Sequence, residues 1–79
     1  MPRYHFNVDN GTGFVADEEG RELPDLAAAR AEGVKGVRSI LAEDVLNGRI
    51  DLLGRLDIVD GAGKVLLAIR FAEAVEISR

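Results

Sequence analysis

The sequence of 79 residues contains no cysteine and no tryptophan. Without cysteine, the chain forms neither a disulfide scaffold nor a thiolate metal site, and nothing in it points to an oxidising compartment. A length of 79 residues suits one small domain, residues 1–79, in which a single modest hydrophobic core must suffice without covalent staples.

Basic residues are in deficit, since 10 lysine and arginine residues stand against 14 acidic ones and give a net charge of −4. This balance argues against a general binder of phosphate backbone, so we expect no nucleic-acid partner. Long apolar runs are also missing, both the ~20 residues that cross a bilayer and the shorter core of a signal peptide. We therefore expect a cytoplasmic protein with no membrane partner.

What is present begins with a β-hairpin. Residues 3–8 alternate, with Tyr4 among the apolar side chains of one face and His5 among the polar side chains of the other. The segment Asp9-Asn10-Gly11-Thr12-Gly13 follows, and Asn-Gly favours a tight hairpin turn. We predict that residues 14–16 return as a second strand, and that residues 21–23 add at most a brief extended piece.

A single long helix is predicted over residues 26–46. Asp25 is suited to cap its first turn, and Asn47-Gly48 is a typical helix end. The apolar residues recur at helical spacing and form one broad stripe: Leu26, Val34, Val37, Ile40, Leu41 and Val45.

A second hairpin is predicted from the alternation in residues 52–59 and 65–71, with Asp60-Gly61-Ala62-Gly63 as the turn. The order hairpin, helix, hairpin predicts an α+β two-layer sandwich, in which one long helix packs on a four-stranded, mainly antiparallel sheet. We expect the core to contain Tyr4, Phe6, Phe14, Val37, Leu41, Leu56, Ile58, Leu67, Ile69 and Phe71.

Catalytic patterns are sparse. His5 is the one histidine and lies on the polar side of the first predicted strand, while Ser39 and Ser78 have no supporting motif. A calcium loop that starts at Asp9 fails, because Gly11 and Gly13 stand at two ligand positions. We interpret the carboxylates before the helix as a solvated acidic rim: Asp9, Asp17, Glu18, Glu19, Glu22 and Asp25. We expect no enzyme, no metal and no cofactor; a metal-dependent enzyme that uses the acidic loop is a less favoured alternative.

Two glycine motifs are interpreted as structural. The segment Gly61-Ala62-Gly63-Lys64 lacks the first glycine and the Ser or Thr of a phosphate-binding loop, and it opens a strand. The segment Gly33-Val34-Lys35-Gly36 has the G-x-x-G spacing of the KH domains that bind nucleic acid. Apolar periodicity continues through it, so we expect two glycines inside the helix that let it lie close to the sheet.

The whole chain resembles a small bacterial family known only as a domain of unknown function. The segments that carry the resemblance are Met1-Pro2-Arg3-Tyr4-His5-Phe6, Asp17-Glu18-Glu19-Gly20, Glu22-Leu23-Pro24-Asp25 with Ala28-Ala29-Arg30, and Phe71-Ala72-Glu73-Ala74-Val75. This resemblance implies no activity, substrate or site. A more distant architectural likeness is to HicB-type antitoxins, although the chain has no helix-turn-helix pattern and lacks their Pro-Asp-x-x-Gly-Cys pattern.

Our functional hypothesis is a non-enzymatic interaction module that forms a homodimer or binds another protein, with a HicB-like regulatory partner as the alternative. One helix covers one face of the sheet, and we expect the other face to carry Arg3, His5, Asn7, Val15, Arg55, Asp57, Val59, Leu66, Ala68 and Arg70. Self-association is expected to use this open face or an edge strand. The residues of the predicted interaction surface are Val15, Arg55, Val59, Leu66, Ala68 and Arg70.

Overall fold

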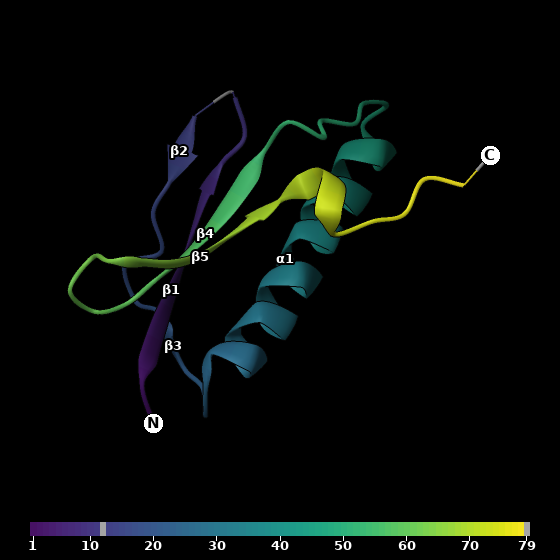
Figure 1. The fold of residues 1–79 in the computed structure, drawn as a ribbon. Coiled ribbons are helices and arrows are strands. Elements are labelled where there is room, and N and C mark those ends of the chain that lie inside the picture. The colour runs from purple at the N-terminus through teal and green to yellow at the C-terminus, as the bar shows by residue number, and fades with distance from the viewer. Residues whose placement is uncertain (12, 79) are drawn as a thin grey trace.

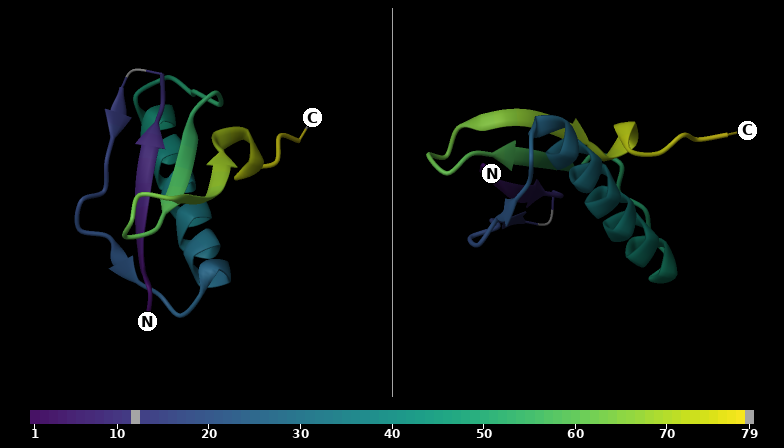
Figure 2. Two further views of the ribbon diagram at one scale, coloured as in Figure 1. Left: turned by 60° about the vertical axis from the view of Figure 1, so that its left-hand side comes forward. Right: turned by 90° about the horizontal axis from the view of Figure 1, so that it is seen from below.

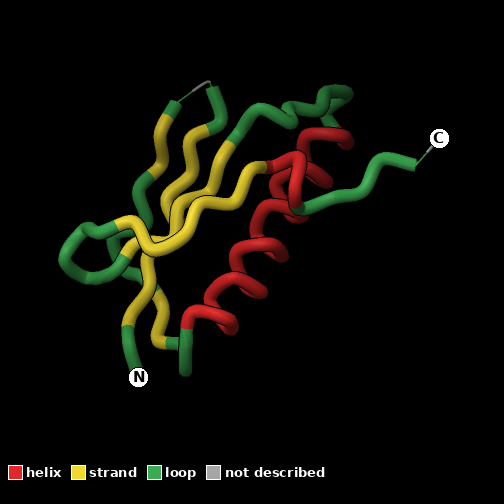
Figure 3. Tube along the Cα trace, viewed as in Figure 1, coloured by secondary structure: helices red, strands yellow, loops and turns green. Residues whose placement is uncertain are grey.

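The computed structural model describes residues 1–11 and 13–78. One long helix packs against a twisted antiparallel sheet, so the predicted α+β fold is confirmed (Figures 1 and 3). The elements in chain order are β1 (Arg3–Asp9), β2 (Phe14–Val15), β3 (Arg21–Glu22), α1 (Leu26–Leu46), β4 (Arg55–Val59), β5 (Val65–Arg70) and the 3₁₀ turn η1 (Phe71–Glu73).

The sheet has five strands in place of the four expected. The strand order is β2-β1-β4-β5, and β3 also pairs with β1, so β2 and β3 share one edge of β1 (Figure 2). All pairings are antiparallel, and the two hairpins join through β1 and β4. The strand β5 therefore ends the sheet on the other side, and among the described residues no strand lies beside its outer edge.

The helix begins and ends where the sequence predicts. The side chain of Asp25 accepts a hydrogen bond of 2.8 Å from the N–H of Ala28, and Gly48, just past the last turn, has a φ of +81°. The helix is continuous through Gly33 and Gly36, so this segment is not a KH-type loop. A Cβ on Gly33 would lie 3.0 Å from Cδ1 of Ile69, which shows how closely the helix approaches the sheet.

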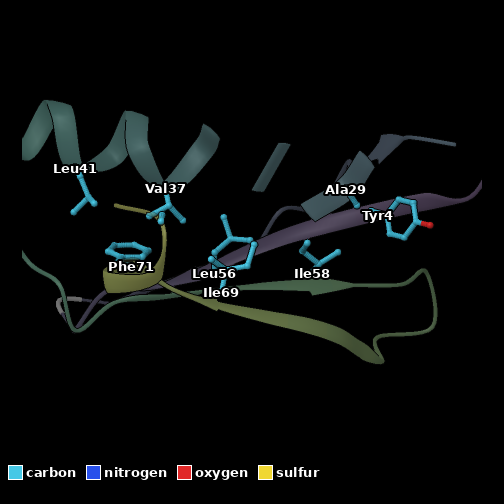
Figure 4. Packing of buried hydrophobic residues seen from close by; sticks show 9 residues of the cluster. Tyr4, Ala29, Val37, Leu41, Leu56, Ile58, Ile69 and Phe71 are labelled. Atoms are coloured by element: carbon cyan, nitrogen blue, oxygen red, sulfur yellow. The ribbon is translucent and has the colours of Figure 1, made fainter. Parts of the chain in front are cut away.

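The core lies between α1 and the face of the sheet turned toward it (Figure 4). Seven of the predicted core residues are buried, while Phe6 and Leu67 are partly buried and pack against this cluster. The buried cluster consists of Tyr4, Ala29, Val37, Leu41, Leu56, Ile58, Ile69, Phe71 and Ala74.

The short strand β2 forms close to where it was predicted, but the faces assigned to its side chains were wrong. Phe14 is 60% exposed, because it lies opposite Asp9 on the face of the sheet that points away from the helix. Val15 lies opposite Val8 and therefore shares the helix-side face, not the open face to which we assigned it. Side chains alternate along a strand, so an error of one residue across the turn exchanges the two faces. Thr12, which the predicted turn includes, lies outside the described residues.

Candidate functional site

The open face of the sheet does not present the single apolar patch that the sequence suggested. Val59 is only 7% exposed, and Leu66 lies at a register shift where it packs partly against the core. Val15, as shown above, is on the opposite face. The structure does bring Arg55, Ala68 and Arg70 together.

Charge dominates this part of the open face. Arg55 and Arg70 lie directly opposite each other on β4 and β5, and the Nε of Arg55 donates a 2.9 Å hydrogen bond to Asp57. Asp9 lies opposite Arg55 on the other side, in β1. The surface predicted for interaction is therefore mostly polar, and its apolar members are separated or covered.

A polar cluster on the same sheet holds the acidic loop against β1. The two carboxylate oxygens of Asp17 accept hydrogen bonds of 3.1 Å from the N–H groups of Phe6 and Gly20. The N–H of Asp17 donates a 2.9 Å bond to the side-chain oxygen of Asn7. Neither β2 nor β3 pairs with β1 at Phe6. There the carboxylate of Asp17 accepts the hydrogen bond from the backbone N–H of Phe6 that a neighbouring strand would otherwise accept.

His5 belongs to this cluster. Its Nδ1 lies 2.7 Å from the carbonyl oxygen of Asp17, and because a carbonyl oxygen only accepts, Nδ1 carries the hydrogen. Asp17 is partly buried, so our interpretation of it as part of a solvated rim was wrong, whereas Glu18 and Glu19 are exposed as expected. Within residues 1–11 and 13–78, no group of three or more His, Cys, Asp or Glu residues is arranged to hold a metal ion.

A second candidate site is an apolar groove beside the C-terminal half of α1, with a volume of about 680 Å³. The last turns of α1 diverge from the sheet, and the chain after η1 runs past them as an extended tail (Figure 2). Val45, predicted to be in the core-facing stripe, is therefore 57% exposed. The groove is lined by Arg38, Leu41, Ala42, Val45, Leu46, Ile50, Val75, Glu76 and Ile77.

Arg38 fixes the two sides of this groove to each other. Its Nε donates a 2.7 Å hydrogen bond to the carbonyl oxygen of Ala74, at the start of the tail. The groove nevertheless leaves large apolar side chains in water, since Leu46 is 87% exposed and Ile77 is 68% exposed. Sequence reasoning missed this surface, because the helical spacing of Val45 does not reveal where the sheet stops covering the helix.

The chain belongs to a family described as a domain of unknown function (DUF6894), whose model matches residues 3–72. No curated protein and no solved structure matches the chain, so the likeness to HicB-type antitoxins has no support from these comparisons. Among the described residues, no helix combines the length and the apolar character that crossing a membrane requires.

The residues that carry the family resemblance have structural roles. Asp17 and Gly20 hold the acidic loop to β1, and a Cβ on Gly20 would lie 2.8 Å from the carbonyl oxygen of Tyr4. Asp25 caps α1, and Phe71 is fully buried in the core. The family features therefore account for the fold and identify no reacting group.

Proposed function

We propose that this protein is a non-enzymatic interaction module that self-associates. The observation that carries the proposal is the apolar groove beside α1, where large apolar side chains are exposed close together. Contiguous exposed apolar surface on a small protein marks an interaction site more often than chance surface does.

The polar cluster supports a role without catalysis. Both carboxylate oxygens of Asp17 are engaged by backbone N–H groups, and the Nδ1 of His5 is engaged by a backbone carbonyl. These bonds hold the acidic loop against β1, so the positions of both side chains are accounted for by a structural role.

The edge of β5 offers a competing route to self-association. Its residues 65–69 carry no charge, and in the part of the chain that the structure describes no strand pairs with its outer side. Uncharged edges of this length are able to pair with a second chain. The groove is favoured because its exposed side chains are larger and more numerous, and an experiment can separate the two routes.

Self-association is tested by light scattering on purified protein over a dilution series at micromolar concentration. The expected mass at the higher concentrations is twice the 8.5 kDa of one chain, and it falls toward 8.5 kDa on dilution. A mass of 8.5 kDa at every concentration contradicts the proposal. The variant Ala68→Lys, at an exposed position of the open face that the sequence suggested, is expected to dimerise like the wild type.

A further inference from the structure

We infer that the groove beside α1 is the contact between two copies of the chain, with Arg38 of one copy set against Glu76 of the other. The inference rests on the proposed self-association and specifies its surface and symmetry. It follows from the two walls of the groove, from the charges they carry and from where the exposed apolar side chains lie.

The two walls come from different parts of the chain. The helix contributes Leu41, Val45 and Leu46, and the tail contributes Val75 and Ile77 (Figure 1). Of the ten large hydrophobic side chains exposed in the described residues, four line this groove: Val45, Leu46, Ile50 and Ile77. The groove is therefore the richest apolar surface that the fold leaves uncovered.

Two exposed residues of opposite charge line the groove, one from the helix and one from the tail. Arg38 belongs to the helix wall and Glu76 to the tail wall, and both side chains are exposed. Within residues 1–11 and 13–78, neither of them makes an ion pair. The Nε of Arg38 is used by Ala74, which leaves the terminal amino groups of the guanidinium for a partner.

A twofold axis that runs along the groove sets the helix wall of each copy against the tail wall of the other. Arg38 then faces the partner's Glu76, and the same pair is repeated by symmetry. The same axis sets Val45 and Leu46 against the partner's Ile77, so apolar side chains meet apolar side chains.

A second copy of the chain fits this groove better than a partner whose contact surface carries charges of a single sign. Two copies with a net charge of −4 each repel at long range, so their contact needs apolar burial and locally matched charge. The groove supplies both, because it combines exposed apolar side chains with one residue of each charge sign. A standard interface buries about 800 Å² per partner, roughly one seventh of the 5440 Å² surface of this chain.

Charge reversal at Arg38 and at Glu76 tests whether these two residues pair across the dimer. We expect Arg38→Glu and Glu76→Arg each to raise the dimer dissociation constant about tenfold or more, since each single change creates two like-charged contacts across the axis. The double variant restores opposite charges and keeps the net charge at −4, so we expect it to dimerise more tightly than Arg38→Glu alone. It also lacks the hydrogen bond from Arg38 to Ala74, so we expect it to stay weaker than the wild type. Sedimentation equilibrium gives the constants, and circular dichroism confirms the fold.

Lysine substitutions test the apolar part of the contact. Leu46→Lys is expected to abolish the dimer, whereas Leu53→Lys, at a side chain 96% exposed outside the groove, is expected to leave it unchanged. Ala68→Pro tests pairing through the edge of β5. Two results would show that the inference is wrong while the wild type still dimerises. In the first, neither Leu46→Lys nor the charge reversals weaken the dimer. In the second, Ala68→Pro is the one variant of this set that weakens the dimer. A monomeric wild type refutes the proposed self-association itself.

Discussion

Replacing Gly54 by alanine should destabilise the protein more than the small size of the change suggests. Gly54 is buried next to Phe71, and its carbonyl oxygen accepts a 2.9 Å hydrogen bond from the N–H of Phe71. A Cβ built on Gly54 would lie 2.5 Å from Cδ2 and 2.8 Å from Cζ of the Phe71 ring. Carbon atoms pack at about 3.5–4.0 Å, so the ring or the backbone must move by roughly 1 Å.

The ring has little room to move, because Phe71 is fully buried and belongs to the core cluster. Overpacking of a core typically costs about 1–3 kcal/mol and sometimes more, and a clash with a rigid ring belongs at the upper end. The free energy of unfolding of a domain this size is about 4–12 kcal/mol. A loss of about 3 kcal/mol lowers the melting temperature of such a domain by about 12–24 °C.

Thermal unfolding followed by circular dichroism measures this effect, and Gly36→Ala provides the matched control. The nearest atom to a Cβ on Gly36 is Cδ1 of Leu56 at 3.9 Å, an ordinary contact distance. Alanine is favoured over glycine inside a helix by about 1 kcal/mol, so this variant should melt about 5 °C higher. If Gly54→Ala melts at or above the wild-type temperature, the packing of Phe71 against Gly54 is wrong.

Three further predictions concern the core, the acidic loop and ligands. Leu41→Ala should lower the free energy of unfolding by about 2–5 kcal/mol in urea titration, because it opens a cavity beneath α1; an unchanged midpoint would mean that the helix face is misassigned. Asp17→Ala should cost about 2 kcal/mol and speed amide exchange at Phe6 and Gly20, whose N–H groups lose their acceptor, whereas Glu18→Ala, at an exposed side chain, should change neither. EDTA should leave the melting temperature unchanged, and RNA should not bind in a salt-sensitive manner at submicromolar concentration; either effect would reopen the metal or nucleic-acid hypothesis.

The elements that the sequence predicted well are those defined by neighbouring residues. The ends of α1 depend on Asp25 and on Asn47-Gly48, each within one turn of the helix terminus it closes. The strands β4 and β5 show their alternation directly, and the buried side chains of β4 are those predicted, apart from Val59. Local chemistry is sufficient for such features, because their partners are close in sequence.

The features that the sequence did not predict depend on contacts between distant segments. Asp17 resembles any acidic loop residue until its hydrogen bonds to Phe6 and Asn7, about ten residues away, are known. The exposure of Phe14 depends on a register that the turn residues alone do not specify. The groove depends on where α1 leaves the sheet, which is a property of packing and not of helical periodicity.

This division agrees with the proposed function. Asp17, Asp25 and Phe71 lie in the segments on which the family resemblance was based, and all three hold the fold together. The exposed apolar side chains of the groove bury only part of their surface in the described structure, and leaving the rest in water is unfavourable. Because Leu46 is the most exposed of them, a polar residue there should cost the monomer almost no stability. A change at Leu46 that alters assembly and leaves folding intact therefore separates the binding surface from the scaffold that carries it.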